Sequence, residues 1–371
     1  MTPPWKISTM VVKRNKQKVV LGFSGGVDST AAALLLKEKG LQVTGLFFDV
    51  VPGPTAAAEE AKKRAEEVGI DFLYKDVSEA FKEAVIGDFC ACYASGKTPN
   101  PCIRCNPAIK FATLIDGADE IGAEYIATGH YAQVKYLAEE DCYAVYRARN
   151  LKKDQSYMLY RLGQEVLSRL ILPLGQFESK EEIRAMLREE AISNAEQPDS
   201  QEICFLPDDT EYADYLQRQG VKAVPGEFTD REGNVLGRHK GLVHYTIGQR
   251  KGLGVALGKP MFVVELDSEN NRVILGENQD LFRRDVLIED IKITEKCYGK
   301  AFGAQGKVRY LAPAAQAFVK PAETAENAGE SGCKDRLLVT FEQPQRAPAP
   351  GQSLVLYDGD RVLGGGIIIT K

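Results

Sequence analysis

The sequence predicts an α/β protein: an N-terminal open parallel sheet with flanking helices, a small helical central domain and a C-terminal antiparallel β-barrel. Three observations lead to this prediction. Apolar strand-like runs alternate with helical patterns over the first third of the chain, the middle section is mainly helical, and strand signals dominate after about Val221. With 371 residues, 44% of them hydrophobic, the chain can build two or three domains. We expect these domains at residues 1–160, 161–218 and 219–371.

Strands separated by helices characterise the first third. A parallel neighbour needs a crossover of about a dozen residues or more, so this alternation predicts parallel pairing. Open sheets of this kind bind ligands at the carboxyl ends of their strands. The expected strands are Lys18–Phe23, Gln42–Val50, Asp71–Val77 and Glu124–Gly129, and the expected helices are Ser29–Lys39, Thr55–Val68, one capped by Ser78, and Ala108–Ile121.

The middle and last parts of the chain change character. Residues 179–182 form a capping box that opens an amphipathic helix to about Ala191. Farther on, turn residues join pairs of strand-like runs, which predicts antiparallel hairpins. The expected hairpins pair Phe262–Leu266 with Arg272–Leu275 and Ser353–Leu356 with Arg361–Ile369, and a polar loop is expected at residues 322–334.

Charge and hydropathy restrict the class of protein. No apolar run approaches the ~20 residues needed to span a bilayer, and the N-terminus lacks a signal-peptide pattern, so we expect a cytoplasmic protein without membrane contact. The net charge of -5 argues against general phosphate binding. Residues 147–161, 231–251 and 301–320 are nonetheless basic, and their Tyr side chains could stack on RNA bases. Taken singly, each stretch is also typical of a solvated surface.

A glycine-rich loop follows the first strand and leads into a helix. Two adjacent glycines let the backbone approach an anion, two hydroxyls add donors, and the helix N-terminus attracts negative charge. The loop therefore predicts a polyphosphate cradle, with Asp28 as a ligand of Mg²⁺, although an ordinary glycine turn is the alternative. The residues of the loop are Gly22, Phe23, Ser24, Gly25, Gly26, Val27, Asp28 and Ser29.

The eight cysteines favour reactive or metal-binding thiols, since no export signal points to disulfides. Cys102 and Cys105 stand in a Pro-rich loop before a helix, where Arg104 would lower a thiol pKa. Three alternatives stay open: structural zinc held by residues 90, 92, 102 and 105, a redox-active pair, and a three-cysteine iron-sulfur site that includes Cys204. Cys90 and Cys92 also fit small buried thiols of a helix.

The glycine-rich loop resembles the PP-loop of ATP pyrophosphatases, which split ATP into AMP and pyrophosphate. Further motifs follow in order and make the resemblance specific, because together they are similar to tRNA-specific 2-thiouridylases over nearly the whole chain. These motifs are Thr98-Pro99-Asn100-Pro101 with Cys105-Asn106, Gly129-His130-Tyr131, Lys153-Asp154-Gln155-Ser156-Tyr157, the segment around Cys204, and residues 244–250.

The resemblance implies a HUP-like catalytic domain, ATP and Mg²⁺ as cofactors, and a role for each matching residue. Cys105 would be the nucleophile and Cys204 the carrier of a persulfide from a cysteine desulfurase or sulfur-relay protein. Residues 22–29 with Phe48 and Gly129 would bind ATP. The residues expected to meet tRNA are Asn100, Pro101, Cys102, His130, Lys152, Lys153, Asp154, Gln155, Arg309, Tyr310 and Gln352.

One position departs from the family pattern. Many members have Asp where this chain has Cys102, and a thiol cannot take over a carboxylate's role because its reference pKa is about 8.5 against about 3.9. With Cys105 and Cys204 it could instead hold a 4Fe-4S iron-sulfur cluster with one open iron. His130, His244 and the pair Gln249-Arg250 could each be structural or surface residues.

The implied reaction adenylates the C2 oxygen of the wobble uridine, position 34, in tRNAs with Lys, Glu or Gln type anticodons, and replaces it with sulfur. The target base must leave its stack to reach such a pocket. Two rival functions follow from the same motifs. One is a PP-loop synthetase that adenylates a small metabolite, and the other is a non-enzymatic RNA-binding or zinc module.

Overall fold

The computed structural model describes residues 17–197, 203–206, 210–255, 258–322 and 336–369. The chain divides into two compact units. Unit 1 comprises Met1–Lys82 and Cys105–Glu202, and unit 2 comprises Glu83–Arg104 and Ile203–Lys371. Each unit is described by itself below. The predicted domain boundaries after residues 160 and 218 stay predictions.

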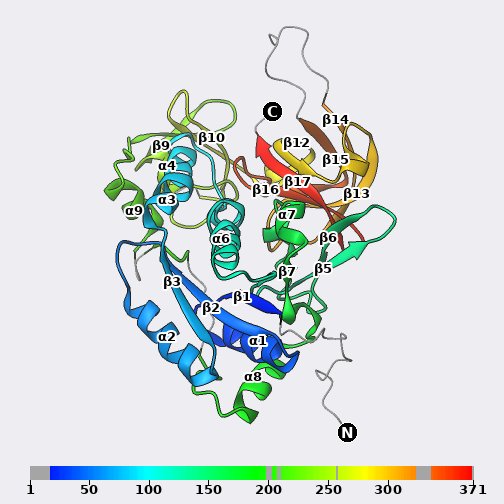
Figure 1. Ribbon diagram of the computed structural model, residues 1–371. Coiled ribbons are helices and arrows are strands. Elements are labelled where there is room, and N and C mark those ends of the chain that lie inside the picture. Colours follow the sequence, from blue (N-terminus) through cyan, green and yellow to red (C-terminus); the bar gives the residue numbers. More distant parts are fainter. Residues whose placement is uncertain (1–16, 198–202, 207–209, 256–257, 323–335, 370–371) are drawn as a thin grey trace. The chain divides into compact units, whose positions relative to one another are not determined.

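Unit 1 is built on a parallel five-stranded sheet, as predicted (Figure 1). The strands occur in the order β3-β2-β1-β4-β7. Val19, Val20 and Leu21 at its centre are fully buried, which is typical of a parallel strand covered on both faces. The bounds are β1 Lys18–Gly22, β2 Gln42–Asp49, β3 Asp71–Asp76, β4 Tyr125–Ala127 and β7 Leu170–Ile171.

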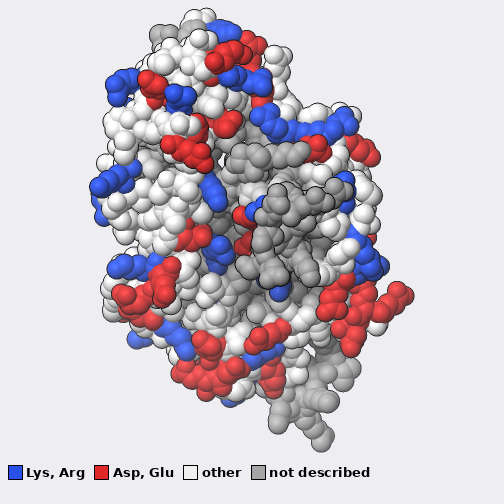
Figure 2. All heavy atoms as spheres, turned by 90° about the horizontal axis from the view of Figure 1, so that it is seen from above, with Lys and Arg blue, Asp and Glu red and all other residues white. Residues whose placement is uncertain are grey.

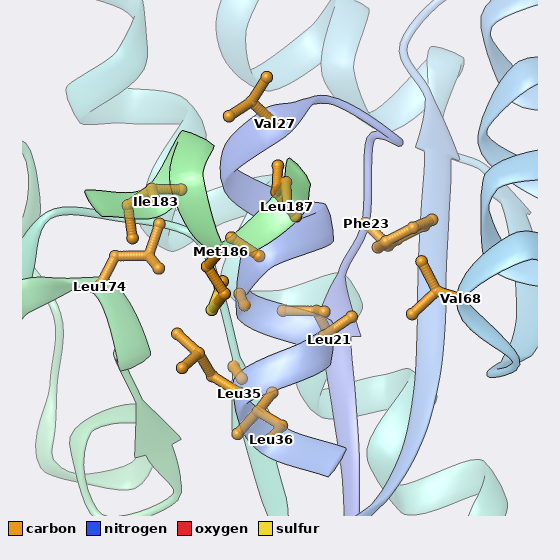
Figure 3. Packing of buried hydrophobic residues seen from close by; sticks show 14 of the residues in the cluster. Leu21, Phe23, Val27, Leu35, Leu36, Val68, Leu174, Ile183, Met186 and Leu187 are labelled. Atoms are coloured by element: carbon orange, nitrogen blue, oxygen red, sulfur yellow. The ribbon is translucent and has the colours of Figure 1, made fainter. Parts of the chain in front are cut away.

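Helices cover both faces of this sheet. Figure 1 shows α1 (Val27–Glu38), α2 (Ala56–Val68) and α8 (Lys180–Glu189) on one side and α6 (Phe111–Ile121) on the other. The strand residues alternate accordingly, since Leu21 packs in the cluster that contains α1, whereas Val20 faces Gly117 of α6. Figure 3 shows side chains of α8 beside α1, and these include Ile183, Met186 and Leu187.

Of the two predicted caps, the one at Ser179 is confirmed and the one at Ser78 is wrong, and Thr55 adds a cap that was not predicted. The hydroxyl of Thr55 accepts a hydrogen bond from Ala58 N, and Ser179 and Glu182 form the predicted capping box. Ser78 is instead the first helical residue of α3 (Ser78–Phe81), and its side chain does not cap the helix. The other elements of unit 1 include the hairpin β5 (Ala132–Leu137) and β6 (Cys142–Arg147), the π-helical turn Asn106–Lys110, the 3-10 turns Ser156–Leu159 and Pro173–Gln176, and α7 (Gln164–Leu167).

Unit 2 contains two sheets. A four-stranded sheet has the order β10-β11-β8-β9, and six antiparallel strands close into the predicted barrel by the pairing of β12 with β17. The first sheet is β8 Gly226–Thr229, β9 Val235–His239, β10 Phe262–Asp267 and β11 Arg272–Gly276. The barrel is β12 Phe282–Ile293, β13 Phe302–Lys307, β14 Ala315–Pro321, β15 Leu337–Arg346, β16 Ser353–Asp358 and β17 Arg361–Ile369.

Both predicted hairpins of unit 2 are confirmed, as β10 with β11 and β16 with β17. The sequence did not separate the four-stranded sheet from the barrel. The helices of this unit include α4 (Gly87–Ala94) and α9 (Tyr212–Arg218), and α5 (Pro101–Cys105) ends at the boundary with unit 1. The predicted loop at 322–334 lies outside the described residues except for Ala322.

Within the described ranges, none of the helices has both the length and the apolar character that a membrane crossing requires. Basic and acidic side chains are interspersed on the face shown in Figure 2. This mixture fits the net charge of -5, so any affinity for RNA has to come from local patches.

We predict that Gly175→Ala destabilises the protein, because an added Cβ would lie 1.8 Å from the carbonyl oxygen of Ala132. Relief of this clash has to displace the start of β5 or the turn at Pro173–Gln176, at a cost of about 1–3 kcal/mol or more. Gly163→Ala is the matched control, since its Cβ would meet nothing within 4 Å. Thermal unfolding of both variants measures the difference, and equal melting temperatures would contradict the prediction.

Candidate active site

The candidate site lies at the carboxyl edge of the parallel sheet. β1 pairs with β2 on one side and with β4 on the other, so the order of the strands reverses next to β1. A crevice opens at such a reversal outside the strand ends, and ligands of open α/β sheets bind there. The loops that flank the reversal are residues 22–29 after β1 and residues 128–131 after β4.

The glycine-rich loop has the backbone conformation that its residues predict. Gly25 adopts φ +74°, and an added Cβ would lie 3.0 Å from Ala61 Cα in α2, so only glycine fits. Gly26 caps α1, and the hydroxyl of Ser29 donates to its carbonyl oxygen at 3.0 Å. Ser24 is exposed at the front of the loop. The first backbone N–H groups of a 12-residue helix therefore face the crevice beside two hydroxyls.

Asp28 joins the loop to two distant segments. Its carboxylate accepts a hydrogen bond from the hydroxyl of Tyr131 at 2.8 Å and one from the ammonium group of Lys180 at 3.2 Å. The Lys180 side chain is 14% exposed and that of Asp28 is 34% exposed. The common P-loop has a lysine inside its motif, whereas here the lysine comes from the first turn of α8. The capping box at Ser179 was its only signal in the sequence.

Asn194 supports the loop from behind. Its side-chain amide donates to the carbonyl oxygen of Gly25 at 2.6 Å and to the hydroxyl of Thr30 at 3.3 Å, and the residue is 5% exposed. The neighbouring Ser193 donates its backbone N–H to the carboxylate of Glu67 in α2. Sequence reasoning missed Asn194, since 169 positions separate it from Gly25.

The loop after β4 packs directly on the glycine-rich loop. A Cβ at Gly129 would lie 3.1 Å from the backbone carbon of Asp28, so this position also needs glycine. His130 is half-buried, its Nδ1 lies 2.7 Å from the hydroxyl of Thr128, and its ring stacks on Phe111. Burial, together with the nearby positive charge of Lys110, lowers the pKa of His130 well below its usual value. The imidazole is therefore neutral at physiological pH.

Phe48 is the next-to-last residue of β2 and is half-buried at the same edge of the sheet. The following Asp49 is buried, and its carboxylate accepts hydrogen bonds from Thr55 and from the hydroxyl of Tyr74. Phe48, Gly129 and the glycine-rich loop thus come from the ends of three adjacent strands. This is the placement that the sequence predicts for a nucleotide site.

The buried carboxylate of Asp154 organises the turn in which it lies. Asp154 is 5% exposed, and one carboxylate oxygen accepts the N–H groups of Ala148 and Ser156 while the other accepts the Ser156 hydroxyl. The backbone of Gln155 pairs with Tyr131. Lys152 is exposed and Lys153 is half-buried. Contact of these residues with tRNA stays a prediction, to which the lysines are better suited than the buried Asp154.

The predicted cysteines differ in exposure. Cys102 is exposed and Cys105 is 8% exposed, although both belong to α5. The side chain of Asn100 accepts the backbone N–H of Cys102 at 3.2 Å, which caps this short helix after Pro101. Arg104 lies 3.3 Å from Asp88 and 3.6 Å from Asp290, so carboxylates already balance the charge that was expected to lower a thiol pKa.

Cys204 is exposed and belongs to unit 2, whereas Cys105 belongs to unit 1. The next residue, Phe205, is buried, with its ring centroid 5.4 Å from that of Phe89 in α4 and 5.5 Å from that of Tyr215 in α9. The edge contact with Phe89 and the tilted contact with Tyr215 anchor the short segment that carries the thiol.

Three residues that were predicted to meet tRNA lie in the barrel of unit 2. Gln352 donates to the carbonyl oxygens of Thr98 at 2.9 Å and Pro99 at 3.3 Å, so it holds the Pro-rich loop in place. Arg309 is half-buried and donates to the carbonyl oxygen of Ile247 at 2.8 Å. Tyr310 is half-buried near the ammonium group of Lys307. Their contact with tRNA stays a prediction.

The zinc alternative finds no support in the described part of the chain, where no group of three or more His, Cys, Asp and Glu side chains could hold a metal ion. Cys90 and Cys92 lie in α4, as expected of helical thiols, and burial raises the pKa of both. His244 is half-buried, Arg250 is exposed, and Gln249 bonds to backbone groups of its own turn. His244, Gln249 and Arg250 can therefore still be either functional residues of the family motif or ordinary structural and surface residues.

Comparisons with known proteins place the chain in a family. Residues 17–208 match the tRNA methyl transferase HUP domain, residues 213–277 the tRNA methyl transferase PRC-barrel domain, and residues 294–368 the aminomethyltransferase beta-barrel domain.

Among curated proteins, the tRNA-specific 2-thiouridylase MnmA of Acetivibrio thermocellus is 40% identical over 95% of this chain and 99% of its own length. The protein of the same name from Clostridioides difficile is 42% identical over 95% and 98%, and MnmA 1 of Caldanaerobacter subterraneus is 43% identical over 95% and 98%. The chain belongs to the tRNA-specific 2-thiouridylase family.

Proposed function

We propose that this protein replaces the C2 oxygen of the wobble uridine, position 34 of tRNA, with sulfur and consumes ATP in doing so. The observation that carries the proposal is the glycine-rich loop at the strand reversal, whose Asp28 is held by Tyr131 and Lys180. A loop of this kind binds a polyphosphate, and the family supplies the substrate class.

The loop fits the triphosphate of ATP. The positive φ of Gly25 and the missing side chain of Gly26 leave room for phosphate oxygens against the backbone. The N-terminus of α1 favours negative charge at this point. Phe48 and Gly129 come from the adjacent strand ends and would contact the adenosine.

Mg²⁺ fits the site through Asp28. The ion prefers carboxylate, phosphate and water oxygens, and one carboxylate with substrate phosphates is a usual ligand set. When bound, it would neutralise charge on the leaving pyrophosphate. Lys180 lies 3.2 Å from the same carboxylate, so its ammonium group would also stand near the phosphates.

The first step activates a poor leaving group. The uracil C2 oxygen attacks the α-phosphorus of ATP, the bond from that phosphorus to the β-phosphate oxygen breaks, and pyrophosphate leaves with the electron pair. Backbone N–H groups of the loop and Lys180 stabilise the charge that develops. Sulfur then bonds to C2, and AMP leaves with the former C2 oxygen.

The sulfur travels through cysteine thiols in this proposal. A cysteine desulfurase or relay protein transfers sulfur to Cys204 as a persulfide, and Cys105 is the nucleophile. Release of persulfide sulfur at the level of sulfide takes two electrons, which come from two cysteine thiolates as they form a disulfide. A thiol reductant outside the protein has to reopen that disulfide for the next turnover.

A 4Fe-4S cluster on Cys102, Cys105 and Cys204 is the alternative carrier. Cys105 belongs to unit 1, whereas Cys102 and Cys204 belong to unit 2, and no step is assigned to a cluster. Iron and sulfide analysis of protein purified without oxygen distinguishes the two carriers.

Recognition of tRNA would combine local basic charge with neutral contacts near the pocket. His130 is neutral, so it would meet the RNA by hydrogen bonding or stacking rather than by pairing with a phosphate. Lys152, Arg309 and Tyr310 supply charge and an aromatic ring elsewhere. The substrates would be tRNAs with Lys, Glu or Gln type anticodons.

We predict that Lys180→Met lowers the rate of pyrophosphate release with tRNA by about 100- to 1,000-fold, as is usual when one charge-stabilising group is removed. Lys180→Arg should retain part of the activity because it keeps the charge. Pyrophosphate release measured with ATP, Mg²⁺ and tRNA gives the rates. Arg188→Met is the control in the same helix, since its partners are the exposed Glu181 and Glu196. Equal losses in Lys180→Met and Arg188→Met would refute the role of Lys180.

We predict that Cys105→Ser and Cys204→Ser each abolish 2-thiouridine in tRNA, because a hydroxyl cannot carry sulfane sulfur or supply electrons at this potential. Nucleoside mass spectrometry of tRNA after reaction with each variant measures the product. Cys142→Ser, on the hairpin strand β6, is the control and should thiolate normally. If either cysteine variant retained full thiolation, the role proposed for that cysteine would fail. If both variants and the wild type adenylated a small metabolite equally well, the rival synthetase function would replace this one.

A further inference from the structure

We propose that Tyr131, Gln155 and Asn106 form a hydrogen-bonded connector that positions the backbone of Cys105 relative to Asp28 of the glycine-rich loop. The proposal deepens the function proposed above and rests on it. All residues of the connector belong to unit 1, and every link is an interaction at 2.8 or 2.9 Å.

The first end of the connector is at the glycine-rich loop. The hydroxyl of Tyr131 donates to Asp28 Oδ1 at 2.8 Å, and the Tyr131 side chain is 2% exposed. Close packing of Gly129 on the backbone of Asp28 holds the same two segments together. Tyr131 therefore cannot shift without displacing the carboxylate of Asp28.

The middle of the connector is a two-bond clamp. The backbone N–H of Gln155 donates to the carbonyl oxygen of Tyr131 at 2.8 Å, and the backbone N–H of Tyr131 donates to Gln155 Oε1 at 2.9 Å. Asp154 holds the turn that follows, because its buried carboxylate accepts three hydrogen bonds from Ala148 and Ser156. The clamp is thus backed by a rigid turn.

The other end of the connector is at the thiol. The backbone N–H of Met158 donates to the carbonyl oxygen of Gln155 at 2.9 Å, and Asn106 Nδ2 donates to the carbonyl oxygen of Met158 at 2.8 Å. Asn106 is 1% exposed, directly follows Cys105 and begins the π-helical turn Asn106–Lys110. Turns of this kind occur frequently at functional sites.

Burial of the Asn106 side chain costs free energy, which argues that the hydrogen bond from its Nδ2 group has a function. Its Oδ1 is buried and, among the described residues, has no hydrogen-bond partner. An apolar residue of similar size would avoid that desolvation cost but could not hold the carbonyl oxygen of Met158. The side-chain amide of Asn106 therefore lowers the stability of the fold but fixes the position of the Cys105 backbone.

Such positioning matters because the reaction has two stages. An adenylated base is useful only if sulfur reaches C2 before water does, and displacement of a reacting group by about 1 Å can cost about 100-fold in rate. A connector between the ATP-binding loop and the nucleophile keeps these two groups in register. Gln155 and Asn106 act on the reaction through Cys105, so they are positioning residues.

The test compares two products in one assay with the full chain. Pyrophosphate released and 2-thiouridine formed are measured on the same samples with ATP, Mg²⁺, tRNA and a sulfur donor. We expect Asn106→Ala and Gln155→Leu to lower the 2-thiouridine formed per pyrophosphate released by about 10- to 100-fold, with pyrophosphate release less affected. Gln155→Glu keeps the oxygen that accepts the Tyr131 N–H, so it should retain the wild-type ratio within about threefold.

Gln164→Ala is the matched control. Gln164 makes two hydrogen bonds to the backbone of Tyr143 in the same unit, outside the connector, so its loss should lower stability without changing the ratio. Thermal melting of each variant shows that it is folded.

The connector is refuted if Gln155→Leu and Asn106→Ala keep the wild-type ratio, or if Gln155→Glu loses as much as Gln155→Leu while the KM for tRNA rises. The latter result would make Gln155 a direct contact of the negatively charged RNA. A wild-type protein that forms no 2-thiouridine would instead refute the proposed function, and the connector with it.

Discussion

The arrangement of the site depends on the two hydrogen bonds that the carboxylate of Asp28 accepts. Asp28 lies in the first turn of α1, and its carboxylate binds the hydroxyl of Tyr131 after β4 and the ammonium group of Lys180 at the start of α8. An ion pair that is partly exposed adds only about 1 kcal/mol or less to stability. Its value here is geometric, because one side chain sets the relative positions of three segments that are far apart in the sequence.

Backbone packing makes that geometry possible. Gly25 and Gly129 have no side chain, so the glycine-rich loop can approach α2 on one side and the loop after β4 on the other. Asn194 then donates to the carbonyl oxygen of Gly25 and so fixes its direction. The N–H groups at the start of α1 are left to face an anion. The packing of the glycine-rich loop and the hydrogen bond from Asn194 thus both favour an anion at the N-terminus of α1.

The sequence predicts what local patterns determine. The alternating strands and helices and the capping box at Ser179 are encoded locally and are confirmed, and the glycine-rich loop has the positive φ that its glycines allow. The contacts of Lys180 and Asn106 were missed, although Asn106 belongs to a recognised motif, because their partners lie 152 and 52 positions away and no local pattern indicates such contacts. Asp154 shows the converse, since the family resemblance implied a tRNA contact for it, whereas its buried carboxylate organises a turn.

The thiolation reaction has to exclude water from the adenylated base, and this requirement bears on where the nucleophilic thiol lies in the fold. Water attacking C2 of an adenylated uridine would restore the oxygen and waste the ATP, so the thiol must already be close when the base is activated. Cys105 is 8% exposed, and the next residue is bonded into a turn that the Gln155 clamp joins to the ATP-binding loop. The exposed thiol of Cys204 suits the carrier role that we propose for it, because a sulfur donor would have to reach it. The difference in burial between Cys105 and Cys204 thus agrees with the two roles that we propose.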